Sequence, residues 1–173
     1  MRRLNKKQVA RIDALIDGLD KREIPPDQAA YILATAFHET DAFKTLEEYA
    51  TGANYEGRKD LGNTHDGDGQ RFKGRGYVQI TGRRNYADWS KRLGVNLVGK
   101  PWLAKDLNYA VPIIIEGMLK GTFTSRKLST YFTSTKKDWI QARRIVNRLD
   151  RAAIIGRYAE RIYGVIKEKG DDE

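Results

Sequence analysis

The segment at residues 29–37 reads AAYILATAF and is apolar on nearly every face of the helix that it would form. A helix without a polar face must be covered by other elements on all sides, so it belongs at the centre of a domain. Pro25 and Pro26 interrupt the chain just before it, and Asp27 can cap the new helix. This segment therefore predicts a domain built around one buried helix that ends near Glu39.

Helical periodicity also marks both ends of the chain. A capping pair, Asn5 and Gln8, opens a run with apolar residues at helical spacing, and residues 150–167 carry a second apolar face. Shorter helical segments are expected near residues 86–93, 110–119 and 139–146. Residues 51–76, by contrast, are rich in glycine and lose all periodicity, and residues 77–81 (YVQIT) have the pattern of a short strand. The expected architecture is mainly α, with a small β element and a long glycine-rich loop.

The length of 173 residues suits a single domain. A mean hydropathy of −0.66 with 32% charged residues excludes an integral membrane protein, since no run approaches the ~20 apolar residues of a spanning helix. The amino terminus is basic, but charges interrupt the residues that follow, so the apolar core of a secretory signal is missing. The absence of cysteine excludes disulfides and thiolate zinc sites.

The net charge is +9, with a sequence pI of about 9.7. This balance favours a polyanionic partner, which on composition alone is nucleic acid, an anionic membrane surface or an acidic wall polymer. The alternative is that the lysines and arginines only form ordinary solvated helix faces. Between Lys136 and Gly170, ten Lys and Arg residues stand against four Asp and Glu residues, so this stretch holds about two-thirds of the excess positive charge.

Glu39 is the most informative polar residue because it directly follows the apolar helix. A carboxylate there is partly desolvated, which favours its protonated form and suits a general acid. Glu48 follows nine residues later, and in a continuous helix the two side chains would face opposite ways. They can meet only if the chain turns between them, for which Thr40 and Asp41 are suitable. Two carboxylates across a cleft perform glycoside hydrolysis, whereas the alternative is that Glu47 and Glu48 form a solvated turn.

Other chemistries lack the residues that they need. Residues 38–42 read HETDA, without the second histidine of the H-E-x-x-H zinc motif, and the remaining histidine, His65, has no cysteine to activate. Residues 64–69 (THDGDG) lack both the frame and the distal glutamate of a calcium loop. Residues 74–76 do not continue as a phosphate-binding motif. No metal and no cofactor are therefore expected.

Longer motifs resemble those of a known family. They are HET at residues 38–40, LEEY at 46–49, YEGRKDLGN at 55–63 and FKGRGYVQITGRRNY at 72–86. Over about residues 27–158 the chain resembles glycoside hydrolase family 19, and more closely the bacteriophage endolysin branch of that family. The resemblance implies a mainly α, α+β lysozyme-like fold in which the glycine-rich loop lines a substrate cleft. It also implies cleavage of β-1,4 bonds between N-acetylated sugars with inversion.

The same resemblance assigns roles to individual residues. Glu39 of the HET motif matches the general acid, and Glu48 matches the general base that activates water. Thr81 matches the hydroxyl residue that helps to hold this water, because a hydroxyl group both donates and accepts hydrogen bonds. Gln79 and Asn85 match substrate-contacting positions.

Five further residues complete the expected site or its surroundings. Asn147 falls where the family has an Asn-Gly-Gly-like turn, although residues 147–151 read NRLDR in this sequence. Arg151 is a candidate for the arginine that orients the base. Tyr49 is a candidate for stacking on a sugar, with a core position as its alternative. Glu47 is the alternative base, and Glu56 is expected to brace the glycine-rich loop.

These observations predict a phage- or prophage-type endolysin, an inverting muramidase that cleaves peptidoglycan glycan strands for host cell lysis. Residues 1–173 are expected to form one monomeric catalytic domain without a separate cell-wall-binding module. Without a signal peptide, the enzyme would be made in the host bacterial cytoplasm and would depend functionally on a holin-type protein to reach the wall. Anionic outer-membrane lipid is a further candidate partner, and nucleic acid is not expected. The alternatives are a chitinase, a lytic transglycosylase, and a basic module that only binds wall polymer or nucleic acid.

Overall fold

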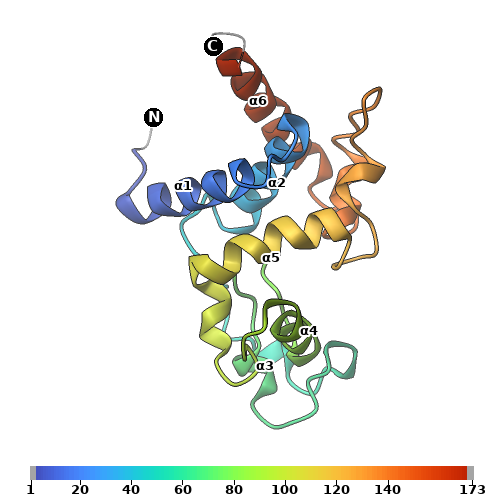
Figure 1. Ribbon diagram of the computed structural model, residues 1–173. Helices are drawn as coiled ribbons and strands as arrows, with labels where there is room; N and C mark the ends of the chain where they lie inside the picture. The colour runs from blue at the N-terminus through green and yellow to red at the C-terminus, as the bar shows by residue number, and fades with distance from the viewer. Residues whose placement is uncertain (1–2, 171–173) are drawn as a thin grey trace.

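Helix α2 (Pro26–Glu39) lies at the centre of the protein, as its apolar sequence predicts. The computed structural model describes residues 3–170, and in it Ala30, Ile32 and Ala36 of α2 are completely buried. Helix α6 (Ala152–Gly170) packs along α2, and α5 (Leu107–Lys120) crosses the middle of the molecule (Figure 1). The long apolar run of α5 is buried because α2 and the amino-terminal helix pack against it.

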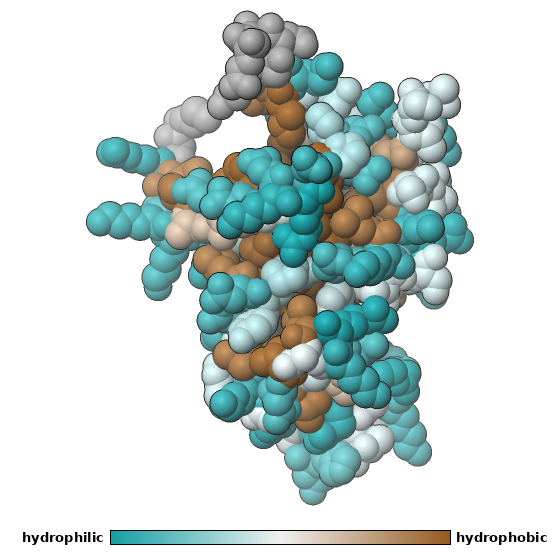
Figure 2. All heavy atoms as spheres, viewed as in Figure 1, coloured by the Kyte–Doolittle hydropathy of each residue, from teal (hydrophilic) through white to brown (hydrophobic). Residues whose placement is uncertain are grey.

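Helix α1 (Lys6–Asp20) packs against α5 and closes the upper part of the protein. Its first turn confirms the predicted capping pair. The Asn5 side chain accepts a hydrogen bond from the backbone N–H of Gln8 at 2.9 Å, and the Gln8 side chain accepts one from the Asn5 N–H at 3.0 Å. Apolar residues, brown in Figure 2, show between the charged side chains over these upper helices.

Residues 51–76 are more regular than their sequence predicts. They contain the short helices η1 (Ala53–Tyr55), η2 (Lys59–Leu61) and α3 (Asp68–Arg71), which lie with α4 (Arg83–Leu93) in the lower part of Figure 1. Sequence periodicity misses elements this short because they make fewer than two turns. A turn η3 (Pro101–Lys105) then leads into α5.

Two carboxylates hold this glycine-rich segment together. Glu56 accepts hydrogen bonds from the backbone N–H groups of Gly67 at 2.8 Å and Gly69 at 2.7 Å, which confirms its predicted bracing role. Asp68, only 1% exposed, forms a two-point ion pair with Arg83 at 2.6 and 2.8 Å. These oxygens are engaged within the protein, and no cluster suited to a metal ion occurs among the described residues.

The predicted strand at residues 77–81 is wrong. Residues 76–79 form a turn between the bridging residues Arg75 and Ile80, and Glu47 pairs with Arg75 in a second isolated bridge. Gly76 and Gln79 have φ angles of +83° and +56°, which an extended strand does not tolerate. The β structure in the described part of the chain thus consists of isolated bridges.

The region between α5 and α6 contains short helices instead of the single longer helix expected near residues 139–146. These are η4 (Leu128–Thr130) and η5 (Gln141–Ile145). The predicted carboxy-terminal helix is confirmed as α6, although the side chain of Lys169 and residues 171–173 lie outside the description. Among the described helices, none has the length and apolar character needed to cross a membrane.

Candidate active site

A cavity of about 600 Å³ brings together side chains from six separate segments of the chain. Five of the residues predicted from the sequence contribute to its lining: Glu39, Glu48, Gln79, Thr81 and Asn147. The others that line it are Tyr55, Leu61, Val78 and Val146. Because Tyr55 and Leu61 belong to the glycine-rich segment, the prediction that this segment lines a cleft is confirmed.

Glu39 and Glu48 reach the same cavity because the chain turns sharply after α2, at the place that the sequence predicts. Asp41, Ala42 and Phe43 have φ angles of +48°, +58° and +62°, so three consecutive residues are left-handed. For non-glycine residues this conformation costs about 1–2 kcal/mol each, and it persists only where neighbours hold it.

The neighbours that hold this turn come from α1 and from the end of α2. Gln8 Nε2 donates to the Ala42 carbonyl at 2.8 Å, and Arg11 Nη1 donates to the Phe43 carbonyl at 2.7 Å. The buried Thr40 hydroxyl accepts a hydrogen bond from the Phe43 N–H at 2.9 Å. The amino-terminal helix therefore helps to determine where the chain runs between the two glutamates.

Arg143 makes a direct contact with Glu39 that the sequence does not predict. Its side chain is 3% exposed, and Nη1 lies 2.6 Å from Glu39 Oε1. Arg143 Nε also donates to the Asp150 carbonyl at 3.0 Å. Glu39 Oε2 has no hydrogen-bond partner among the described residues.

His38, which precedes Glu39, is half-buried at the end of α2. Burial lowers the pKa of its imidazole, and the charges of Arg143 and Arg151 lower it further, although Glu39 raises it. The imidazole is therefore neutral near pH 7, which makes His38 a poor source of protons.

Glu48 is held by the backbone of the facing segment. Gly74 donates its N–H to Glu48 Oε2 at 2.6 Å, and the Glu48 N–H donates to the Gly74 carbonyl at 3.0 Å. A side chain at position 74 would place its Cβ 2.7 Å from the same carboxylate oxygen, so any residue other than glycine would force the Glu48 carboxylate to shift. Tyr55 lines the same cavity. Burial raises the pKa of its phenol, and the charge of Glu48 raises it further.

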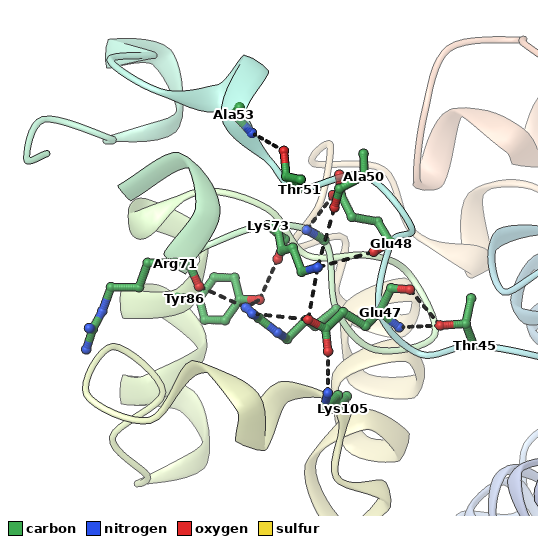
Figure 3. Close-up of polar contacts among 12 residues, drawn as sticks. Thr45, Glu47, Glu48, Ala50, Thr51, Ala53, Arg71, Lys73, Tyr86 and Lys105 are labelled. Carbon is green, nitrogen blue, oxygen red and sulfur yellow. Dashed lines mark hydrogen bonds and ion pairs between the residues drawn. The ribbon is translucent and has the colours of Figure 1, made fainter. Parts of the chain in front are cut away.

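Glu47 points away from this cavity into a cluster of three cations. Lys73 Nζ lies 3.1 Å and Arg75 Nη2 3.5 Å from Glu47 Oε1, and Lys105 contacts Oε2 (Figure 3). Burial acts to raise the pKa of Glu47, but hydrogen bonds from Lys105 and Lys73 and the charge of Arg75 outweigh it and bring the pKa to about 2. A carboxylate this acidic and this fully engaged is a poor base near neutrality, which leaves Glu48 as the candidate.

Gln79 lies on the turn that replaces the predicted strand, and Thr81 directly follows the bridging residue Ile80. The Thr81 hydroxyl donates to the Gln79 carbonyl at 2.9 Å, and Gln79 Nε2 donates to the Gly76 carbonyl at 2.8 Å. Asn85, in the first turn of α4, does not line the cavity. Its Nδ2 donates to the Thr81 carbonyl at 2.7 Å, so it supports the backbone next to the site.

Two other predicted residues lie outside the cavity lining. Tyr49 is 75% exposed, and its hydroxyl donates to Asp41 Oδ2 at 3.1 Å. It belongs neither to the core nor to the cavity lining. Arg151 is exposed with a φ of +60°, and the arginine that contacts a cavity glutamate is Arg143.

The sequence contains little signal for the residues that were missed. Tyr55 stands within a motif of the resemblance, so it was available as a candidate. Arg143 and Arg144 are adjacent and chemically identical, and only packing makes the first buried and the second partly exposed. Leu61, Val78 and Val146 are ordinary apolar residues in the sequence, and their place in the cavity follows from the fold.

No protein-family model matches the sequence. Among solved structures, a chitinase C mutant has 18% identity and a TM-score of 0.51, over 83% of this chain and 68% of its own. Chitinase C from Streptomyces griseus HUT6037 has 16% identity and a TM-score of 0.46, over 83% of each chain. A bacterial family 19 chitinase has 18% identity and a TM-score of 0.47, over 87% of this chain and 85% of its own.

At these identities the likeness concerns the fold. The first of the three structures has a TM-score above 0.5, and it supports the mainly helical, lysozyme-like architecture expected from the sequence.

Proposed function

We propose that this protein is an inverting glycoside hydrolase that cleaves the β-1,4 bonds of bacterial peptidoglycan, a muramidase of the endolysin type. The observation that carries the proposal is the single cavity lined by both Glu39 and Glu48, each from a different element and each in a different environment. Two carboxylates in unlike surroundings are the apparatus of this reaction. The fold shared with a chitinase C structure gives independent support.

In the proposed mechanism Glu39 protonates the leaving oxygen through Oε2, while Arg143 fixes the direction of the carboxyl group through Oε1. Glu48, held by the Gly74 N–H, activates a water on the opposite face of the sugar. Thr81 lines the same cavity as Glu48, and its hydroxyl oxygen can accept a hydrogen bond from that water while its proton is donated to the Gln79 carbonyl. Inversion requires the two carboxyl groups to be about 6.5–9.5 Å apart, which leaves room for the water.

The peptidoglycan part of the proposal is supported by the motif resemblance and by the net charge of +9, which suits an anionic wall polymer. In this role the protein works as a single catalytic domain on the wall after a separate holin-type protein has permeabilised the membrane. Anionic outer-membrane lipid is a second proposed surface for the same charge.

A chitinase is the second candidate function, and the fold shared with the chitinase C structure favours it. Both candidates hydrolyse a β-1,4 glycosidic bond with the same two carboxylates, and they differ in which sugars flank that bond. A lytic transglycosylase uses one acid and no water-activating base, so it predicts that Glu48→Gln keeps much of the activity.

The test is to incubate the purified protein with chloroform-treated Gram-negative cells and with soluble chitin oligomers, and to identify the products by mass spectrometry. Reducing muramic-acid ends are the expected result. Anhydro ends would indicate a transglycosylase, and cleavage of chitin alone a chitinase. Proton NMR of the first product checks inversion, since an inverted β bond yields the α-anomer.

Glu39→Gln separates an enzyme from a protein that only binds. The hydrolase proposal expects no product from this variant, although it still folds and binds. A basic binding module would keep its function in Glu39→Gln and would lose binding steeply as salt increases. Absence of product from wild-type protein on both substrates would refute the enzyme proposal.

A further inference from the structure

The segment at residues 147–151 forms an edge of the cavity and is tied to Glu39. Asn147 lines the cavity, and its side chain accepts a hydrogen bond from the Arg148 N–H at 2.8 Å. At the other end of the segment, the Asp150 carbonyl accepts a hydrogen bond from Arg143, the residue that contacts Glu39. One buried guanidinium therefore sets the position of this segment relative to the candidate acid.

This edge carries two exposed arginines, Arg148 and Arg151. Neither guanidinium has a carboxylate partner within 4.0 Å among the described residues, and this includes Asp150, which is exposed in the same segment. Arg151 lies close enough to His38, next to Glu39, for its charge to act on that imidazole. Two exposed cations thus belong to the segment that begins with Asn147 of the cavity lining and is tied to Glu39 through Arg143.

A further exposed cation lies on a short helix that contributes one residue to the cavity lining. Leu61 lines the cavity, and η2, to which it belongs, begins with the exposed Lys59. Arg84 fixes this turn, because it donates to the Asp60 carbonyl at 2.9 Å and to the Lys59 carbonyl at 3.1 Å. The guanidinium of Arg58, by contrast, is already engaged by the Asp60 carboxylate.

An unpaired arginine at the edge of a cleft is suited to binding a carboxylate, because its planar group offers paired N–H donors. Chitin carries no carboxylate. Peptidoglycan carries several carboxylates beside every second sugar. They belong to the peptides that are joined to muramic acid through its lactyl group. The two glutamates act on a β-1,4 bond that chitin and peptidoglycan share. The charged edge therefore distinguishes peptidoglycan from chitin.

We propose that Arg148 and Arg151 bind the carboxylates of the peptide stems and so make peptidoglycan the preferred substrate of this cavity. This inference rests on the proposed glycoside hydrolase function. It adds a specificity-determining edge that lies outside the residues which act on the sugar bond.

The test compares three soluble substrates: peptidoglycan oligomers with their peptide stems, the same oligomers stripped by an amidase to leave one lactyl carboxylate, and chitin oligomers. The variants are Arg148→Glu and Arg151→Glu, with Arg148→Lys as the conservative change. Arg157→Glu is the matched control, since Arg157 is an exposed arginine of α6 that lines a different cavity. The readout is the ratio of kcat/KM on stem-bearing oligomers to kcat/KM on chitin oligomers.

Each charge reversal is expected to lower this ratio about tenfold at low salt, mainly through KM, and the effect should shrink as salt screens the charges. Arg148→Lys should restore most of the ratio, and Arg157→Glu should leave it unchanged. If the charge reversals lower kcat/KM on stripped oligomers as much as on intact ones, the arginines bind the lactyl carboxylate. That result would overturn the assignment to the peptide. An unchanged ratio, or an equal fall for Arg157→Glu, would overturn the proposal as a whole.

Failure of the two proposals gives different results. If wild-type protein cleaves no substrate, the hydrolase function fails and this inference fails with it. If it cleaves chitin oligomers alone, the hydrolase chemistry stands and the peptide-stem edge is wrong. If it prefers stem-bearing oligomers and the arginine variants keep that preference, only the inference about Arg148 and Arg151 is wrong.

Discussion

The backbone N–H of Gly74 donates to Glu48 Oε2 across 2.6 Å, and a Cβ at position 74 would lie only 2.7 Å from that same oxygen. Both contacts follow from the close approach of two segments. The backbone at Gly74 must lie near Glu48 for its N–H to reach the carboxylate, and at that distance a Cβ would touch the same oxygen. Glycine at this position therefore serves contact with the candidate base, and its own backbone is not left-handed. Substitution at position 74 tests this contact directly.

Gly74→Ala is expected to lower kcat at least about tenfold, because the new Cβ would displace Glu48 from its position. The cost in unfolding free energy should be modest, about 1–3 kcal/mol, as for other overpacked sites. Gly164→Ala in α6 is the control, since a Cβ there meets nothing within 4 Å and activity should be retained. Full activity of Gly74→Ala in a steady-state assay would contradict the assignment of Glu48.

Arg143→Gln is expected to abolish most activity and to lower the unfolding free energy by about 3–5 kcal/mol, because the partly buried Glu39 loses its charged partner. Arg143→Lys keeps the charge, but its single ammonium group cannot reproduce the fork that joins Glu39 to the Asp150 carbonyl. It should therefore fold better than Arg143→Gln and still turn over slowly. Chemical denaturation and kcat measured on both variants check this, and wild-type kcat in Arg143→Lys would disprove it.

Glu48→Gln and Glu47→Gln should separate the base from its neighbour. Loss of a general base costs about 10²–10⁴ in rate, so Glu48→Gln should be nearly inactive. Glu47→Gln weakens a cluster outside the cavity and should keep a larger part of the activity. The comparison uses product formation at saturating substrate, and the reverse order of activities would exchange the two assignments.

Glu47 should also contribute to acid sensitivity. Its pKa in the folded protein is about 2, against an ordinary value of 4.5, so the unfolded state binds a proton more readily. The resulting stabilisation is fully present above about pH 4.5 and is lost as the pH falls toward 2. Thermal unfolding of wild type and Glu47→Gln should therefore differ at pH 7 and converge in acid. A constant difference over the whole range would show that the Glu47 charge is not linked to folding.

Local sequence patterns predicted the elements whose character is set by nearby residues. The apolar run in α2 and the capping box of α1 depend on residue types at short spacing, and both are confirmed. Glu56 is confirmed as a brace of the glycine-rich segment to which it belongs. The strand expected at residues 77–81 shows the limit of such patterns. Alternating residue types favour a strand, but the left-handed backbone of Gln79 arises where this segment meets the rest of the chain.

The features of the candidate site fall into the same two groups, those predicted from short stretches of sequence and those that only the fold reveals. The family resemblance of the sequence motifs proposed Glu39, Glu48 and Thr81 as site residues, and the residues after the apolar helix predicted a turn there, since each motif is a short stretch of chain. Only the tertiary structure paired Glu39 with Arg143, 104 positions away, and directed Glu47 away from the cavity toward Lys73 and Lys105. The physical reason is that ion pairs and buried contacts depend on distance in space, whereas spacing along a chain determines only what lies within a few turns.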